Sequence, residues 1–274
     1  MNLQLMYITN KPEVAVLAQK AGVERIFVDL EINGKVERQG HLDTVISHHT
    51  LSDVIAIKKV LTTSKLLVRV NPIFEGSKQE IDTVIDAGAD VIMLPMFTTA
   101  EEVEKFIRYV DGRARTCLLL ETAPALARLD DILEVPGIDE IHVGLNDLHL
   151  SMHLDFIFEL LGDGIVEYIC SKIAAKHIPY GFGGIARVGL GMLPAEYIIA
   201  EHHRLGSQMA ILSRSFCDAN KRSVEEVQEI FMEGVAGIKA FEHTLDAWTE
   251  ADFDRSRKVL KDKVSQIIRE KKSK

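Results

Sequence analysis

Two acidic residues, Glu121 and Asp147, stand where the chain could hold a metal ion. Each follows a short apolar run that predicts a buried strand, residues 116–120 before Glu121 and residues 141–143 shortly before Asp147. An unpaired carboxylate is costly to bury, so we expect each to meet a cation, a metal or several hydrogen-bond donors. Two carboxylates at the ends of neighbouring parallel strands would form the hard-oxygen site that suits Mg²⁺ or Mn²⁺.

A second group of strand-end residues contains one cation among further acids. The predicted second strand ends near Asp29 and Glu31, and the third ends at Arg69. Arg69 could bind a carboxylate through two hydrogen bonds, and a metal on Glu121 and Asp147 could polarise a ketone beside it. Together these groups would chelate a 2-oxo acid and stabilise its enolate.

Other interpretations of these residues stay open. Arg69 could instead form an internal salt bridge with Asp29 or Glu31, and His149 and His153, four positions apart, could form part of a zinc site. The last residues of the predicted strands include no lysine, which argues against Schiff-base chemistry.

The elements that would position this site alternate regularly along the chain. Apolar strand-like runs are separated by stretches with the helical spacing of apolar residues; the runs are residues 3–8, 26–30, 66–70, 91–94, 116–120, 140–143, 179–182 and 208–212. Strands that alternate with single helices predict a parallel sheet covered by helices. Eight repeats predict an α/β fold, a (β/α)₈ TIM barrel that forms a single domain over residues 1–250, followed by a C-terminal helix with a basic tail over 251–274. A doubly wound open sheet is the alternative, and no G-x-G-x-x-G motif follows the first strand to support it.

Helix ends carry recognisable signals. Ser or Thr (or Asn) followed three positions later by Glu predicts capping boxes at Asn10–Glu13, Thr98–Glu101 and Ser223–Glu226. Glycine after an apolar helical stretch predicts helix ends at Gly22, Gly88 and Gly206. His202 and His203 are expected on a solvated helix face.

Composition excludes several classes of protein. The chain has 274 residues, 47% of them hydrophobic, and a net charge of −9 that argues against nucleic-acid binding. Its three cysteines form no C-x-x-C pair, so neither a disulfide framework nor a thiolate zinc site is indicated. Neither a signal peptide nor an apolar run of about 18 residues is present, so we expect a cytoplasmic protein without a membrane span.

Several motifs together resemble the HpcH/HpaI aldolase and citrate lyase family. They are Val28-Asp-Leu-Glu31, Val68-Arg-Val-Asn71, the segment 88–96, Leu120-Glu-Thr-Ala-Pro-Ala-Leu126 and Val143-Gly-Leu-Asn-Asp-Leu148. The resemblance implies a homo-oligomer, a trimer or hexamer, and a divalent metal, Mg²⁺ or Mn²⁺. It also implies that a carbon–carbon bond is cleaved or formed through a pyruvate- or acetyl-CoA-type enolate.

The resemblance also implies roles for individual residues. Glu121 and Asp147 match the metal ligands, Arg69 the arginine beside the oxo-acid oxygens, and Asp29 the acid that supports the site. The backbone at Gly144, Leu145 and Asn146 would face the substrate carboxylate.

One position departs from the family's pattern. The histidine that the pyruvate aldolases carry after the strand-two acid is Ile32 here, and Ile32 does not match the acid of the citrate-lyase branch either. His41, or alternatively His48 or His49, could replace the missing base through a water molecule. His41 is therefore predicted as a catalytic residue with Arg69 and Asp29.

The leading interpretation is a metal-dependent carbon–carbon lyase of the class II aldolase type, which acts on a small 2-oxo acid or a related acid. Loops after the last strands often bind phosphate in barrels, and Ser213 and Arg214 lie there, so the substrate could be phosphorylated or linked to CoA. An oxaloacetate-type decarboxylase, a CoA-ester lyase and a regulatory barrel that binds a metabolite are the alternatives.

Overall fold

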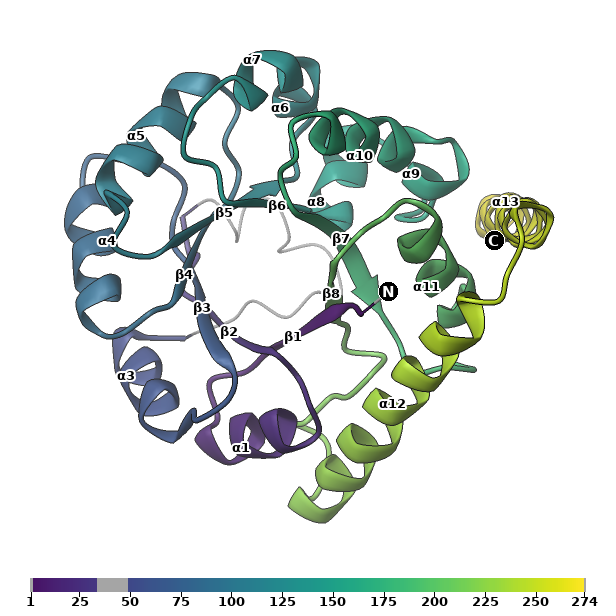
Figure 1. Cartoon of the computed structure of the whole chain (residues 1–274), viewed down its shortest axis with the longest axis horizontal. Coiled ribbons are helices and arrows are strands. Elements are labelled where there is room, and N and C mark those ends of the chain that lie inside the picture. Colours follow the sequence, from purple (N-terminus) through teal and green to yellow (C-terminus); the bar gives the residue numbers. More distant parts are fainter. Residues whose placement is uncertain (1, 34–48, 274) are drawn as a thin grey trace.

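Eight parallel strands close into a barrel in the computed structural model, which describes residues 2–33 and 49–273. Each strand pairs with its neighbour in sequence, and β1 pairs with β8 (Figure 1). The strands are β1 Gln4–Ile8, β2 Arg25–Asp29, β3 Lys65–Arg69, β4 Val91–Leu94, β5 Arg115–Leu120, β6 Glu140–Val143, β7 Tyr180–Ile185 and β8 Met209–Leu212. The (β/α)₈ prediction is confirmed, and the doubly wound open sheet is excluded.

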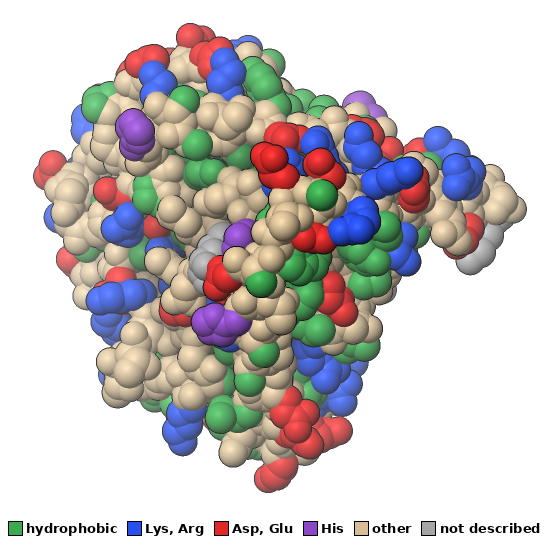
Figure 2. Space-filling model, turned by 45° about the vertical axis from the view of Figure 1, so that its right-hand side comes forward, with side chains coloured by type: hydrophobic (Ala, Val, Ile, Leu, Met, Phe, Trp, Pro, Cys, Tyr) green, Lys and Arg blue, Asp and Glu red, His purple; other side chains and the backbone are tan. Residues whose placement is uncertain are grey.

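Helices surround the barrel and cover the outer face of its strands (Figure 1). They are α1 Pro12–Lys20, α3 Leu51–Val60, α4 Ser77–Asp86, α5 Ala100–Val110, α6 Ala123–Ala127, α7 Leu129–Leu133, α8 Leu145–Ser151, α9 Glu159–Gly162, α10 Ile165–Ala175, α11 Ala195–Arg204, α12 Val224–Leu245 and α13 Glu250–Lys272. The final helix, α13, packs against α9 and α11, and side chains of both charges lie along it (Figure 2). Across the described ranges, no helix combines the length and apolarity that a membrane span requires.

The alternation of side chains along each strand separates two cores. Outward residues pack under the helices, whereas Met6, Phe27, Leu67, Met93 and Leu119 belong to a smaller cluster inside the barrel. Because side chains two positions apart share a face, β2 sends Arg25, Phe27 and Asp29 inward in succession. The interior is therefore apolar at its middle and charged towards both ends.

A buried ion cluster lies at the end of the barrel where the strands begin. Glu140 is 1% exposed and accepts hydrogen bonds from Nη1 and Nη2 of Arg25, the latter at 2.9 Å. Arg115 Nε donates to the same carboxylate at 2.9 Å. This end is occupied by paired charges, which leaves the opposite end for a ligand site.

Strand β7 runs three residues beyond the predicted end at position 182. Its pairing with β8 shifts register between Gly181 and Gly184, so one extra residue is accommodated on β7 as a β-bulge. Gly183 lies within the bulge at φ +55°, in the left-handed region that glycine adopts without steric cost. The predicted strand stops at position 182 because the glycine-rich sequence beyond it lacks the side chains that normally mark a strand.

Helix capping agrees with the sequence at some ends and not at others. The capping box of Ser223 and Glu226 is confirmed, and Gly22, Gly88 and Gly206 all have positive φ. The box predicted at Thr98–Glu101 lies one residue later, at Thr99–Glu102. Asn10 does not cap α1, which begins at Pro12 after Lys11 without a side-chain cap.

Candidate active site

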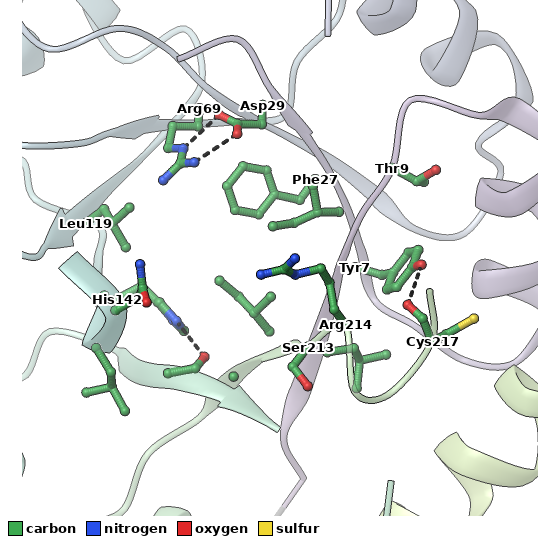
Figure 3. Close-up of a pocket in the computed structure, with 18 of the residues that line it drawn as sticks. Tyr7, Thr9, Phe27, Asp29, Arg69, Leu119, His142, Ser213, Arg214 and Cys217 are labelled. Carbon is green, nitrogen blue, oxygen red and sulfur yellow. Dashed lines mark hydrogen bonds and ion pairs between the residues drawn. The ribbon is translucent and has the colours of Figure 1, made fainter. Parts of the chain in front are cut away.

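A cavity of about 430 Å³ opens at the C-terminal ends of the strands, the end at which (β/α)₈ enzymes carry their active sites. The predicted site residues in the described part of the chain all line it: Asp29, Arg69, Glu121, Gly144, Leu145, Asn146, Asp147, Ser213 and Arg214. Figure 3 shows Asp29, Arg69, Ser213 and Arg214 around this space. His41 and His48 lie outside the described residues. Neither His149 nor His153 is among the lining residues, so the zinc alternative gains no support.

Arg69 is fixed by acids from the neighbouring strand. Its Nε and Nη2 donate to the two carboxylate oxygens of Asp29 at 2.8 and 2.9 Å, and Nη2 lies 3.3 Å from Glu31 Oε2. The guanidinium carbon is 5.6 Å from the centre of the Phe27 ring. The internal salt bridge that the sequence left open is therefore present. Because a guanidinium has five N–H donors, Nη1 still has two to offer a substrate oxygen.

Glu121 is buried at 2% exposure and lies in a crowded acidic environment. Burial raises the pKa of its carboxyl well above the ordinary value; the Arg69 charge opposes this rise, and the Asp147 and Glu31 charges add to it. Oε1 accepts a hydrogen bond of 3.2 Å from the backbone N–H of Met96, which adopts an unusual φ of +53°. The chain thus holds one carboxylate in a position that disfavours its charge.

The acids of the cavity fit a divalent cation. Glu121 and Asp147 both line the cavity, and Asp147 is close enough to Glu121 to raise the pKa of that carboxyl. Among the described residues, no three His, Cys, Asp or Glu side chains form a group that could hold a metal ion by themselves. Mg²⁺ characteristically uses one or two carboxylates and takes its other oxygens from substrate and water. Glu121 and Asp147 match that donor set.

Gly144 makes room for the Glu121 carboxylate. A Cβ added at Gly144 would lie 2.7 Å from Oε2 and 2.8 Å from Cβ of Glu121. We expect Gly144→Ala to displace this carboxylate and to weaken Mn²⁺ affinity by about 10–100-fold, the usual cost of disturbing a ligand's support. Isothermal titration with Mn²⁺ would measure it. Gly237→Ala, where the added Cβ meets nothing within 4 Å, should leave the affinity unchanged; equal losses in both variants would contradict the assignment.

The residues that directly follow β2 are held by the end of β3. Asn71 Oδ1 accepts hydrogen bonds from the backbone N–H groups of Ile32 and Asn33, at 2.9 and 3.0 Å. The Ile32 side chain is 58% exposed, so it does not fill the position of a buried base. The backbone N–H of Asp29 donates to His49 Nδ1 at 3.0 Å, and His49 lines the cavity.

Some lining residues were missed by the sequence analysis. Lys11 lies three residues beyond β1 and lines the cavity, although none of the eight strands of the described chain has a lysine as its last residue. His142 comes from within β6, two positions after Glu140, and its side chain is fully buried. The spacing of Glu140 and His142 was the available signal, because ionisable residues at i and i+2 of one strand share a face.

His202 is a second buried histidine and corrects the expectation of a solvated helix face. It is fully buried, stacks on Phe182 with ring centroids 3.8 Å apart, and its Nδ1 lies 2.7 Å from Ser207 Oγ. Burial lowers its pKa well below the ordinary value, helped by the nearby His142. Burial likewise lowers the pKa of His142 to about 4.

These two histidines predict a stability that falls in mild acid. The folded chain keeps both rings neutral, whereas the unfolded chain protonates them near pH 6.5. As pH falls from about 6.5 towards 4, each should remove about 1.4 kcal/mol per pH unit from the free energy of unfolding. Urea unfolding at pH 7, 6 and 5 would measure the slope. His142→Leu should reduce the slope by one histidine's share, and an unchanged slope would contradict the buried neutral ring.

Comparison with known proteins bears on the family of this chain. A family profile described as HpcH/HpaI aldolase/citrate lyase matches residues 4–156, more than half of the chain. Proteins called 2-keto-3-deoxy-L-rhamnonate aldolase from Salmonella paratyphi B and Salmonella newport are 33% identical over alignments that cover 30% of this chain. The matched region spans 42% of those relatives, less than half of their length.

Solved structures share the fold at low sequence identity. An HpcH/HpaI aldolase from Desulfitobacterium hafniense DCB-2 superposes with a TM-score of 0.61 at 17% identity, covering 87% of this chain and 93% of that one. The citrate synthase SbnG superposes with a TM-score of 0.59 at 16% identity, covering 89% and 95%. These structures support the closed barrel, and the profile carries the family assignment: the chain belongs to the HpcH/HpaI aldolase/citrate lyase family.

Proposed function

We propose that this protein is a metal-dependent carbon–carbon lyase of the class II aldolase type, which forms a pyruvate-like enolate from a 2-oxo acid. The observation that carries the proposal is the meeting of Glu121, Asp147 and Arg69 in one cavity at the C-terminal ends of the strands. A buried carboxylate whose charge is disfavoured, with a second carboxylate nearby and a fixed guanidinium, suits a cation and an anionic substrate together. The relatives named as aldolases support the same class of reaction.

Different groups of the protein would bind different parts of the substrate. Arg69, held by Asp29, would direct its remaining donors at the oxygens of the oxo acid, so Asp29 positions Arg69 and does not itself contact the substrate. The backbone N–H groups at Leu145 and Asn146, in the first turn of α8, would bind the substrate carboxylate, since the N-terminus of a helix favours an anion. Glu121 and Asp147 would hold Mg²⁺ or Mn²⁺, which would supply the positive charge that stabilises the enolate.

A histidine from the segment after β2 would carry the proton. We retain His41 as the predicted group, with His48 and His49 as alternatives; of the three, His49 is described and lines the cavity. Separate His41→Ala, His48→Ala and His49→Ala variants, each assayed for cleavage of a 4-hydroxy-2-oxo acid, would identify the group. Full activity in all three would reject this source of the proton carrier.

Exchange of the pyruvate methyl protons with D₂O, followed by NMR, tests the function directly. An enolate-forming site should exchange these protons in the presence of Mg²⁺ or Mn²⁺ and stop when a chelator removes the metal. Exchange that persists at full rate after chelation would contradict metal dependence. Absence of exchange with metal bound would contradict a pyruvate-type enolate.

Arg214 is proposed to bind a distal anionic group. It lines the cavity beside Ser213 at the end of β8, a region of barrels that often binds phosphate. We expect Arg214→Ala to weaken binding of a phosphorylated or CoA-linked acid by about 10-fold or more, the scale of a charge-assisted hydrogen bond, and to leave pyruvate exchange unchanged. Equilibrium titration with a phosphorylated 2-oxo acid would measure it; unchanged affinity would remove the phosphate from the substrate class.

A decarboxylase of the oxaloacetate type is the second candidate. It is favoured by Ile32, which is exposed where the pyruvate aldolases have a histidine, because decarboxylation of a 2-oxo acid needs the metal more than a base at that position. Metal-dependent release of CO₂ from oxaloacetate without cleavage of any aldol substrate would select it. A cytoplasmic homo-oligomer, and a division of the chain near residue 250, are proposed with either reaction.

A further inference from the structure

His142 has a position that the proposed reaction does not yet use. It lies on β6 with its ring fully buried, and it lines the same cavity as Glu121. Figure 3 shows it across this cavity from Arg69. Within the described chain it belongs to no group of three His, Cys, Asp or Glu side chains that could hold a metal ion. A role as a further metal ligand beside Glu121 and Asp147 is therefore not indicated.

The backbone of β7 determines which ring nitrogen carries the proton. His142 Nε2 lies 3.2 Å from the carbonyl oxygen of Gly183. A carbonyl oxygen can only accept a hydrogen bond, so Nε2 must donate and must carry a hydrogen. Gly183 has φ +55° inside the β-bulge, and a Cβ there would lie 2.6 Å from Leu145 Cδ1. The bulge and its glycine thus aim one carbonyl at the histidine.

The other ring nitrogen is left as a buried acceptor. Burial lowers the pKa of His142 to about 4, so near neutral pH the ring has a single proton, which is the one on Nε2. Nδ1 then has a bare lone pair, and no group among the described residues donates to it. Burying a hydrogen-bond acceptor without a donor costs free energy. A cavity lined by such an acceptor is suited to a ligand that supplies the donor.

The chemistry of the substrate limits where that donor can be. The pyruvate half of an aldol substrate carries a carboxylate and a ketone, whose oxygens only accept hydrogen bonds. The half that leaves as the aldehyde carries a hydroxyl group, which can donate. We propose that His142 Nδ1 accepts a hydrogen bond from the hydroxyl of this leaving half and so determines specificity for hydroxylated acids. The inference rests on the proposed function for the identity of the substrate.

Binding of two uncleavable acids would test this role without relying on turnover. 2,4-Dihydroxypentanoate and 2-hydroxypentanoate differ only in the hydroxyl at C4, and neither has the ketone that cleavage requires. With the Mg²⁺-loaded protein, isothermal titration should show about tenfold tighter binding of the dihydroxy acid, the scale of one hydrogen bond to a buried acceptor. His142→Leu should remove the difference. His142→Asn, whose amide oxygen can stand near the place of Nδ1, should retain part of it.

Two further measurements keep the inference separate from the proposed function and from folding. The wild type should exchange pyruvate protons whatever the role of His142, because pyruvate lacks the hydroxyl. The ¹⁵N chemical shift of His142 Nδ1 in the wild type should change when the dihydroxy acid binds. This measurement needs no variant, so it tests the inference even if His142→Leu does not fold. Equal binding of the two acids by the wild type, or a chemical shift that does not change, would overturn the inference. Failure of the wild type to exchange pyruvate would instead count against the lyase.

Discussion

Glu121→Gln is expected to reduce metal-dependent exchange of pyruvate protons by about 10³-fold, the upper range for loss of one group that stabilises developing charge. Glutamine keeps the shape of the side chain and an oxygen that can accept from the backbone N–H of Met96. It loses the negative charge that would attract the cation. The change therefore separates charge from packing, which Glu121→Ala would not do.

The same substitution should stabilise the metal-free protein. Burial raises the pKa of Glu121 in the folded chain, so the folded state binds the proton more tightly than the unfolded state. As pH rises above the ordinary pKa of a carboxyl, ionisation then lowers the stability of the fold. Removing the charge should raise the melting temperature at pH 7 in the presence of chelator, as measured by calorimetry.

Glu226→Gln is a suitable control because it makes the same chemical change in the capping box of α12, where glutamine is also accepted. It should change neither the exchange of pyruvate protons nor the melting temperature measured in the presence of chelator. If Glu121→Gln exchanged pyruvate protons at the rate of the wild type, Glu121 would not be a metal ligand.

Glu140→Ala is expected to destabilise the fold by about 3–5 kcal/mol, the cost of leaving one partner of a buried ion pair without the other. Arg25 is 6% exposed, so its guanidinium would lose its paired carboxylate in a place that water scarcely reaches. Urea unfolding would measure the loss. Neither Arg25 nor Glu140 lines the cavity, so the folded fraction should keep its pyruvate exchange.

A double variant gives this prediction its internal control. Arg25→Met with Glu140→Leu removes both charges and fills the space with apolar side chains, a change that is often neutral or stabilising for a buried pair. It should recover most of the stability lost in Glu140→Ala. A double variant as unstable as the single one would mean that packing, and not the unpaired charge, causes the loss.

The fold could be predicted from the sequence because its signals are local and repeated. Apolar runs alternate with amphipathic stretches eight times, and this alternation alone fixes a parallel sheet covered by helices. The ends of the helices were harder to predict where two local signals compete. Thr98 and Thr99, followed by Glu101 and Glu102, offer two capping boxes one residue apart, and only the packing of α5 selects the second.

The lining of the cavity was predictable where it consists of residues that end a strand or lie shortly beyond one. Asp29, Arg69, Glu121 and Asp147 line the same cavity because parallel strands end at one rim. His142 was missed because it lies inside a strand, and Lys11 because it lies within the capping box predicted at Asn10–Glu13. His202 was misjudged because adjacent residues on a helix point in directions about 100° apart, so one histidine of the pair faces β7 while its neighbour does not.

The pairing of β1 with β8 has a consequence for how the chain folds. Leu3 N–H donates to Glu242 at 2.8 Å across 239 positions of sequence, and Tyr7 OH reaches the Cys217 carbonyl at 3.1 Å. Contacts of such separation carry a high loop-closure entropy and slow the folding of a domain. Until β1 pairs with β8, each of these strands presents an unpaired edge of the kind that recruits other chains. Aggregation should therefore begin from chains in which this pair has not yet formed, at a rate that rises with the lifetime of the unpaired state.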